Sequence, residues 1–244
     1  MVYKADGRML KSDIRTMIAN ACTKTKRTAI MLPAGGAHDV ALFLQEGVIN
    51  RRTKLFAVER DPDVAAEMWV SLFNLGMGPK TTKHVGEIET LKLKDAKIDL
   101  AYIDLCGPGT EAQIDWIGEQ LLPRLTDDAD VFVTLKTNNR GAGFFAENDL
   151  GIRSMAEFKR ELGIARSLVT TKVTLDGERF GKPTTEPTAI AVAKHRTLFG
   201  QIFGGGFEIR SVAYADLDKN TRKLQGSREM HVLHLTRPKI LAWK

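Results

Sequence analysis

The sequence predicts an α/β fold: a doubly wound, mostly parallel sheet of seven strands that ends in an antiparallel hairpin. Two observations carry this prediction. Short apolar runs typical of buried parallel strands alternate with amphipathic stretches of helix length through most of the 244 residues. The last two apolar segments are joined by a polar, basic loop, which leaves no room for the crossover helix that parallel pairing needs.

The predicted strands are short apolar runs, each bounded by turn-forming or charged residues. Five of them form the parallel part of the sheet, and two form the terminal hairpin. Their ranges are 27–33, 54–60, 83–88, 99–105 and 130–137, followed by 207–217 and 230–238.

The predicted helices place their apolar residues on one face. The helix at 62–76 opens with Pro62, which is favoured in a first helical turn, and closes on Gly76. The helix ahead of the first strand, 11–26, carries Cys22 on its apolar side, so Cys22 is predicted to be a small core residue. Three further helices are predicted at 37–49, 111–125 and 189–203.

Residues 139–187 interrupt the alternating pattern and are predicted to form a cap inserted into one domain that spans 1–244. Within the cap, the sequence predicts a short amphipathic helix near 154–163 and a hairpin around 175–184. No internal repeat, low-complexity tract or long linker divides the chain.

The bulk properties predict a soluble, cytoplasmic protein with an anionic partner. No apolar run approaches the roughly 20 residues that span a bilayer, and the start of the chain lacks the apolar core of a signal peptide. The net charge of +6 favours a nucleic acid as partner. No metal site is predicted, because the two cysteines have no Cys-x-x-Cys spacing and His231 and His234 fall on opposite faces of a strand. The oligomeric state is not determined by the sequence.

The candidate site residues stand just after the predicted strands. In an open parallel sheet, ligands bind beyond the carboxyl ends of the strands. A glycine turn follows the first strand in "PAGGAHD", and Glu59, Glu87 and Asp104 follow the next three. Three acidic groups and a turn that lets the backbone approach a ligand are therefore predicted to meet at one edge.

In these motifs the chain resembles the class I S-adenosylmethionine-dependent methyltransferases, over roughly residues 12–138 and 188–238. The resemblance implies S-adenosylmethionine as the cofactor, Glu59 as the acceptor for both ribose hydroxyls and Glu87 as the residue that faces the adenine amino group. The turn lacks the acidic residue with which the family's loop usually begins. The full implied cofactor set is Pro33, Ala34, Gly35, Gly36, Glu59, Arg60, Glu87, Ile88 and Asp104.

Asp104 is the candidate catalytic residue. It would orient the substrate nucleophile or accept its proton; the alternative is a carboxylate that caps the turn after its strand. Cys106 suggests the cysteine nucleophile of cytosine C5 methylation, but Pro108 follows it instead of preceding it, which favours a buried turn residue.

The candidate substrate-binding segment is "KTNNRGAGFF", which combines cations for phosphate with aromatic rings for base stacking. The leading hypothesis is thus a methyltransferase that acts on nucleic acid. Two alternatives stay open: a methyltransferase for a small molecule or protein, and an inactive nucleic-acid-binding or structural protein of the same fold. The predicted substrate residues are Lys136, Asn138, Asn139, Arg140 and Phe144.

Overall fold

The computed structural model describes residues 9–22, 25–105, 107, 109–136, 155–169, 173–175, 178–180, 186–217 and 224–237. Its main helices are α1 (Lys11–Ala21), α2 (His38–Gln45), α3 (Pro62–Asn74), α4 (Glu111–Trp116), α5 (Met155–Val169) and α6 (Glu186–Phe203). Its strands are β1 (Met9–Leu10), β2 (Thr28–Met31), β3 (Lys54–Glu59), β4 (Thr81–Val85), β5 (Ile98–Asp104), β6 (Leu125–Lys136), β7 (Val173–Leu175), β8 (Glu178–Phe180), β9 (Glu208–Leu217) and β10 (Leu224–Thr236).

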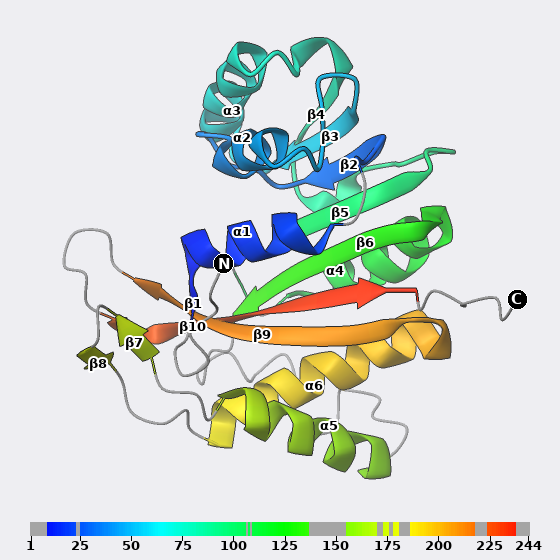
Figure 1. Cartoon of the computed structure of the whole chain (residues 1–244). Helices are drawn as coiled ribbons and strands as arrows, with labels where there is room; N and C mark the ends of the chain where they lie inside the picture. The colour runs from blue at the N-terminus through cyan, green and yellow to red at the C-terminus, as the bar shows by residue number, and fades with distance from the viewer. Residues whose placement is uncertain are drawn as a thin grey trace, which may run out of the picture.

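One mixed sheet runs through the molecule in the order β1-β9-β10-β6-β5-β2-β3-β4 (Figure 1). Strands β2 to β6 pair in parallel, whereas β10 pairs antiparallel with both β6 and β9. The predicted seven strands and the antiparallel terminal hairpin are confirmed. The sequence reading missed β1, a two-residue strand that adds to β9 at the outer edge.

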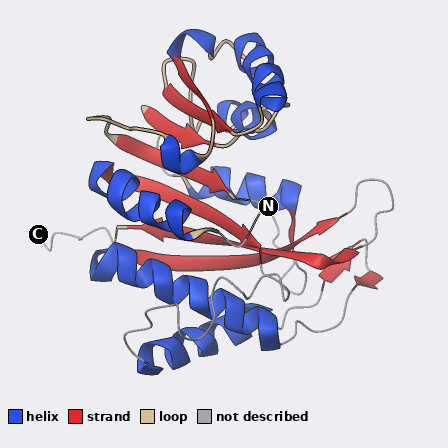
Figure 2. Cartoon of the chain, turned by 180° about the vertical axis from the view of Figure 1, so that it is seen from behind, coloured by secondary structure: helices blue, strands red, loops and turns tan. Residues whose placement is uncertain are grey.

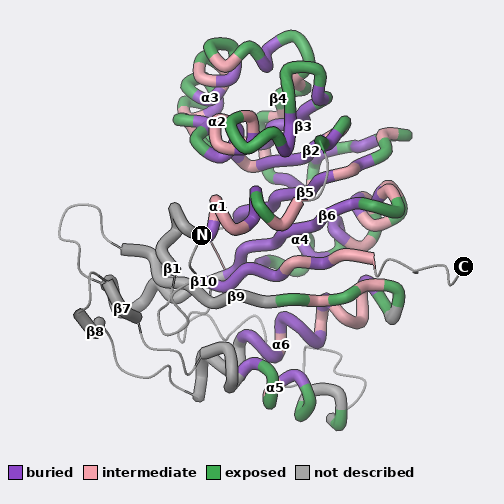
Figure 3. The backbone as a smooth tube through the Cα atoms, in the orientation of Figure 1, coloured by how far each residue is buried: buried purple, intermediate pink, exposed green. Residues whose placement is uncertain are grey.

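Helices cover both faces of this sheet, as a doubly wound fold requires (Figure 2). Helices α1, α2 and α3 bury one apolar layer, whose centre includes Phe43, Tyr102 and Phe132. Helices α4 and α6 bury the other, whose centre includes Trp116 and Phe199. Figure 3 shows the buried residues concentrated along the strands between these two layers.

The sequence reading placed several element boundaries wrongly, for local physical reasons. The helix predicted at 37–49 ends at Gln45, because Gly47 adopts a left-handed φ of 70° that a helix cannot continue. Val48 still packs in the apolar layer from the loop beyond. The helix predicted at 111–125 is α-helical only to Trp116 and then widens into a π-turn over Ile117–Leu121, ahead of a 3-10 turn that contains Pro123.

The predicted insertion 139–187 is described only in part. Its helix is present as α5, which packs against α6, and its hairpin is present as β7 and β8. Among the described helices, none combines the length and the hydropathy needed to cross a bilayer.

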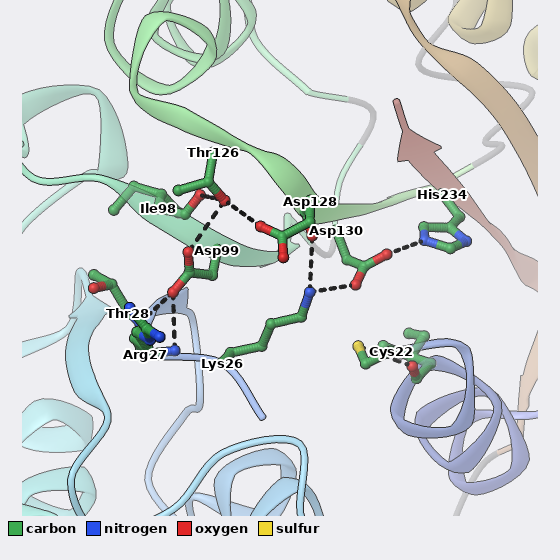
Figure 4. A network of polar contacts seen from close by, with 11 residues as sticks. Cys22, Lys26, Arg27, Thr28, Ile98, Asp99, Thr126, Asp128, Asp130 and His234 are labelled. Atoms are coloured by element: carbon green, nitrogen blue, oxygen red, sulfur yellow. Dashed lines mark hydrogen bonds and ion pairs between the residues drawn. The ribbon is translucent and has the colours of Figure 1, made fainter. Parts of the chain in front are cut away.

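A buried ionic network fixes the amino edge of the sheet, the edge at which the parallel strands begin (Figure 4). Lys26 Nζ lies 2.6 Å from Asp130 Oδ2 and donates to the Asp128 carbonyl, while His234 Nε2 lies 3.1 Å from Asp130 Oδ1. Burial alone raises the pKa of the Asp130 carboxyl, but hydrogen bonds from His234 and Lys26 bring it below its usual value. Asp130 is therefore ionised at neutral pH, and the network locks β6, β10 and the start of β2 together.

Cys22 lies beside this network, directly after the end of α1, and is half-buried against the α1 layer, so it stands at the margin of the core and not within a helix as predicted. Burial, reinforced by the Asp130 carboxylate, raises the pKa of its thiol to about 12. The thiol stays protonated and donates to the Ile18 carbonyl.

The prediction that His231 and His234 face opposite sides of β10 is confirmed. His234 stacks on Phe132 in the α1 layer, whereas His231 stacks on His195 of α6, with ring centroids 4.9 Å apart. Burial, together with His195 and Arg196, brings the pKa of His231 well below its usual value.

Candidate active site at the carboxyl edge

The predicted site residues follow neighbouring strands along the carboxyl edge, the edge at which the parallel strands end. Glu87 follows β4, Glu59 ends β3, the turn 33–36 follows β2 and Asp104 ends β5. Because the strand order is β4-β3-β2-β5, these features line up in that sequence along one edge. The topology therefore brings together the groups that the sequence reading selected.

The turn after β2 places Gly35 against α3. A Cβ on Gly35 would stand 2.6 Å from Glu67 Oε2, and the Gly35 carbonyl accepts a hydrogen bond of 2.9 Å from Ser71 Oγ. Ala34 and Ala37 both adopt left-handed backbone conformations, with φ of 53° and 45°. Such conformations in alanine cost free energy and gather where a loop has a function.

The acid that the turn lacks in sequence stands at the start of α2. Asp39 is buried in the first helical turn and forms an ion pair with Arg15 of α1. Helix α1 begins at the carboxyl edge, since β1 joins the end of β9. The Arg15–Asp39 pair therefore lies at the same edge as the turn.

Glu59 is half-buried at the end of β3. One oxygen, Oε1, accepts a 3.1 Å hydrogen bond from the Asp61 amide, which starts the N-cap of α3. The other oxygen, Oε2, has no partner among the described residues. The backbone carbonyl of Glu59 accepts from the Gly86 amide at 3.0 Å, which ties the ends of β3 and β4 together.

Glu87 is exposed, and its carboxylate lies 3.8 Å from the Arg60 guanidinium. Its neighbour Ile88 is buried in the α4 layer, so the side chain of Ile88 belongs to the core. Glu87 and Arg60 thus present an open, weakly held pair of charges beside Glu59.

Asp104 is buried and accepts a hydrogen bond from Thr134 Oγ1 of the neighbouring strand. The two residues are direct partners in the β5–β6 register. Beyond Asp104, Gly109 adopts a φ of 82°, and Thr110 caps α4 with a reciprocal capping box. Cys106 lies outside the described residues.

The predicted substrate segment is largely outside the described part of the chain. Lys136 is the last residue of β6, where its Cα is paired with Met230. Asn138, Asn139, Arg140 and Phe144 lie in a range that the structure does not describe.

Sequence reasoning missed the residues that support the turn and the carboxylate. Glu67 and Ser71 stand four residues apart, which places them on one face of α3. That spacing was visible in the sequence, but the contact of these two residues with the predicted turn was not. Thr134 could be found only from the strand register.

Comparison with known proteins identifies the fold. No family model matches the chain, and no curated protein matches its sequence. The structure is similar to the O-methyltransferase from Bacillus cereus in complex with SAH, with a TM-score of 0.52 and 7% identity over 93% of this chain and 81% of that one.

Two further solved structures are similar to a comparable degree. The O-methyltransferase TomG from Streptomyces achromogenes, involved in tomaymycin synthesis and solved with SAM, has a TM-score of 0.51 and 13% identity over 92% of this chain and 80% of that one. Cofactor-bound Rv0187 from MTB has a TM-score of 0.50 and 16% identity over 93% of this chain and 81% of that one. The chain therefore has the class I methyltransferase fold.

Proposed function

We propose that this chain is an S-adenosylmethionine-dependent methyltransferase that acts on a nucleic acid. The observation that supports this best is the alignment of Glu59, Glu87 and Asp104 along the ligand edge of a class I methyltransferase fold. Each carboxylate follows a different strand, so no single turn accounts for all three. Fold alone does not establish function, and the proposed activity therefore depends on these residues.

The residues at this edge fit the adenosine part of the cofactor. Glu59 offers a carboxylate oxygen that no described residue occupies, and a carboxylate is a natural acceptor for a vicinal diol. Glu87 is exposed beside it and can accept from an amino group. Gly35 has no Cβ, which lets the turn pack closely against Glu67 of α3 and fixes its position at this edge.

The methionine part would be held differently from the family pattern. The turn begins with Leu32 and Pro33, and Asp39 follows it in the first turn of α2, where its buried carboxylate is paired with Arg15. A guanidinium can hold an amino acid's carboxylate group. We assign Arg15 to that role, with the buried Asp39 as the residue that positions it.

When bound, S-adenosylmethionine supplies an electrophilic methyl group. Asp104 is held by Thr134 and is assigned to the acceptor, whose nucleophile it would orient or whose proton it would accept. Positioning of donor and acceptor contributes most of the rate in such a transfer. The net charge of +6 and Lys136 at the end of β6 support a polyanionic acceptor.

Titration calorimetry with S-adenosylmethionine tests the cofactor assignment. The wild type should bind, and Glu59→Ala should weaken binding about tenfold or more, because the ribose loses its acceptor. Glu46→Ala is the matched control, since it removes an exposed carboxylate at the amino edge. Absence of binding to the wild type at millimolar cofactor would refute the enzyme and support the inactive fold.

A second candidate is a small-molecule methyltransferase, because the Bacillus cereus and Streptomyces neighbours are O-methyltransferases. Transfer of a labelled methyl group separates the two. Label that appears in nucleic acid, with a rate that falls steeply as salt rises, supports the first candidate. Label found only in low-molecular-weight extract supports the second.

A further inference from the structure

We infer that the amino edge of the sheet carries a second binding surface, for the sugar-phosphate backbone of a single-stranded nucleic acid. This surface lies opposite the candidate active site and consists of Arg27, Arg51, Arg52, Lys54, Lys80 and the exposed ring of Phe73. We call it the amino-edge cationic face. Its binding does not depend on the cofactor.

Three cations of this face stand at consecutive strand starts. Arg27 precedes β2, Lys54 starts β3 and Lys80 precedes β4. The Lys54 amide donates to the Arg27 carbonyl at 2.8 Å, and Leu55 is paired with Thr81 in the β3–β4 register. Neighbouring strands are about 4.8 Å apart, so like charges are held close to one another.

No carboxylate of the described residues pairs with these cations. In the segments 25–28, 44–54 and 74–81, Glu46 is the one acidic residue. Asp99 approaches Arg27, but its Oδ2 accepts from the backbone amides of Arg27 and Thr28 (Figure 4). Like charges side by side on a sheet are unfavourable, and an anionic partner would remove that cost.

An open hollow of about 550 Å³ lies beside this row, between the ends of α2 and α3. Arg51 lines it together with the amide side chains of Gln45, Asn50 and Asn74. Among the described residues, Gln45 and Asn74 have no side-chain hydrogen-bond partner. Arginine and side-chain amides are among the groups that contact phosphate and sugar oxygens.

An exposed aromatic ring belongs to Phe73, which directly precedes Asn74 of the hollow in α3. Phe73 is 66% exposed near the end of α3 and packs against Gly78, where a Cβ would come within 3.0 Å of its ring. Arg51 packs against Gly76 of the same turn, with Nε 3.0 Å from the place of a Cβ. An exposed ring beside cations suits an unpaired base, which can stack on it. A duplex or a lipid headgroup offers no such base, so the ring favours a single strand.

The test is fluorescence anisotropy with a labelled single-stranded oligonucleotide of mixed sequence, without cofactor. Arg51→Gln combined with Arg52→Gln should weaken binding about tenfold and make the slope of log affinity against log salt less negative by about 0.7 for each phosphate that is no longer neutralised. Phe73→Ala should weaken binding about tenfold with the salt slope unchanged, because it removes stacking.

Lys92→Gln is the matched control. Lys92 is exposed, and its neighbours Leu91 and Leu93 are buried in the apolar layer under α4 and α6, on the other face of the sheet from α3. Its substitution should leave binding unchanged. Equal weakening of oligonucleotide binding by Lys92→Gln would show that only net charge matters and would overturn the proposed binding surface. A wild type that binds anionic phospholipid vesicles but no oligonucleotide would also overturn it.

Two variants distinguish a failure of this binding surface from a failure of the proposed methyltransferase function. Glu59→Ala should still bind the oligonucleotide through the amino-edge cationic face, and Phe73→Ala should still bind S-adenosylmethionine. Loss of oligonucleotide binding in Glu59→Ala would contradict a surface at the amino edge.

Discussion

At the amino edge of the sheet, Lys26 and Asp130 form a buried ion pair, whereas at the carboxyl edge Glu59 is half-buried and Glu87 is exposed. Lys26 is only 3% exposed, while the side chain of Glu87 is 48% exposed and its cation partner Arg60 lies 3.8 Å away. A buried, paired charge fixes the strands around it. An exposed carboxylate contributes little to the fold and is free to meet a ligand.

The largest expected effect is on the buried network. Lys26→Met should lower the free energy of unfolding by roughly 3 kcal/mol, because it leaves the buried Asp130 carboxylate without its main cation. Urea unfolding measures the loss. Lys97→Met, which removes an exposed cation, should change the free energy by less than about 0.5 kcal/mol. If both variants lose equally little, the network does not lock the strands.

The buried His231 of β10 predicts how the free energy of unfolding depends on pH. The folded-state pKa of His231 is lowered, so His231 is neutral when folded and binds a proton more readily when unfolded. Stability is therefore fully present above the unfolded pKa of about 6.5 and falls as pH drops below it, by up to about 1.4 kcal/mol per pH unit for one proton. His231→Leu should flatten urea unfolding free energies between pH 6.5 and about pH 5. A slope that survives this substitution would assign the acid sensitivity to another group.

A substitution at Gly35 tests the turn at the carboxyl edge and should have a smaller effect on stability. A Cβ in Gly35→Ala would displace the Glu67 carboxylate, a flexible group, so the free energy of unfolding should fall by only about 1 kcal/mol. Affinity for S-adenosylmethionine should fall several-fold, because the turn shifts. Glu67→Ala in the same chain gives the Cβ room and should restore part of the affinity in calorimetry; no recovery would place the turn's function elsewhere.

The smallest expected effect on the free energy of unfolding comes from the exposed pair Arg60 and Glu87. Arg60→Ala should change the free energy of unfolding by no more than about 0.5 kcal/mol, because Arg60 and Glu87 are solvated and 3.8 Å apart. Thermal unfolding at low and high salt measures the change. A loss comparable to that of Lys26→Met would contradict the division between the two edges.

The strands and the acidic groups of the carboxyl edge were predictable from the sequence, because a parallel α/β sheet obeys simple rules. Apolar runs at 54–60 and 99–105 predicted buried strands, and the rule that ligands meet strand ends selected Glu59 and Asp104. The failures have local causes. The helix after β2 is shorter than predicted because Gly47 ends it, and β1 leaves no periodic signal because it has only two residues.

The site was less predictable than the fold, since its supporting contacts join distant parts of the chain. Asp39 was noted as a late acidic residue, but its partner Arg15 lies on another helix. Thr134 reaches Asp104 only through the β5–β6 register. The amino-edge cationic face was hidden for the same reason, as its members are spread over residues 27–80.

The sequence by itself determined the order of strands and helices, the antiparallel ending and the acidic strand ends, because local periodicity and loop length encode them. Only the tertiary structure decided which charges are buried and paired. Lys26, Asp130 and His234 come from distant parts of the chain, and only strand pairing places them in contact. Burial and pairing depend on packing, and packing between distant segments leaves no periodic trace in the sequence.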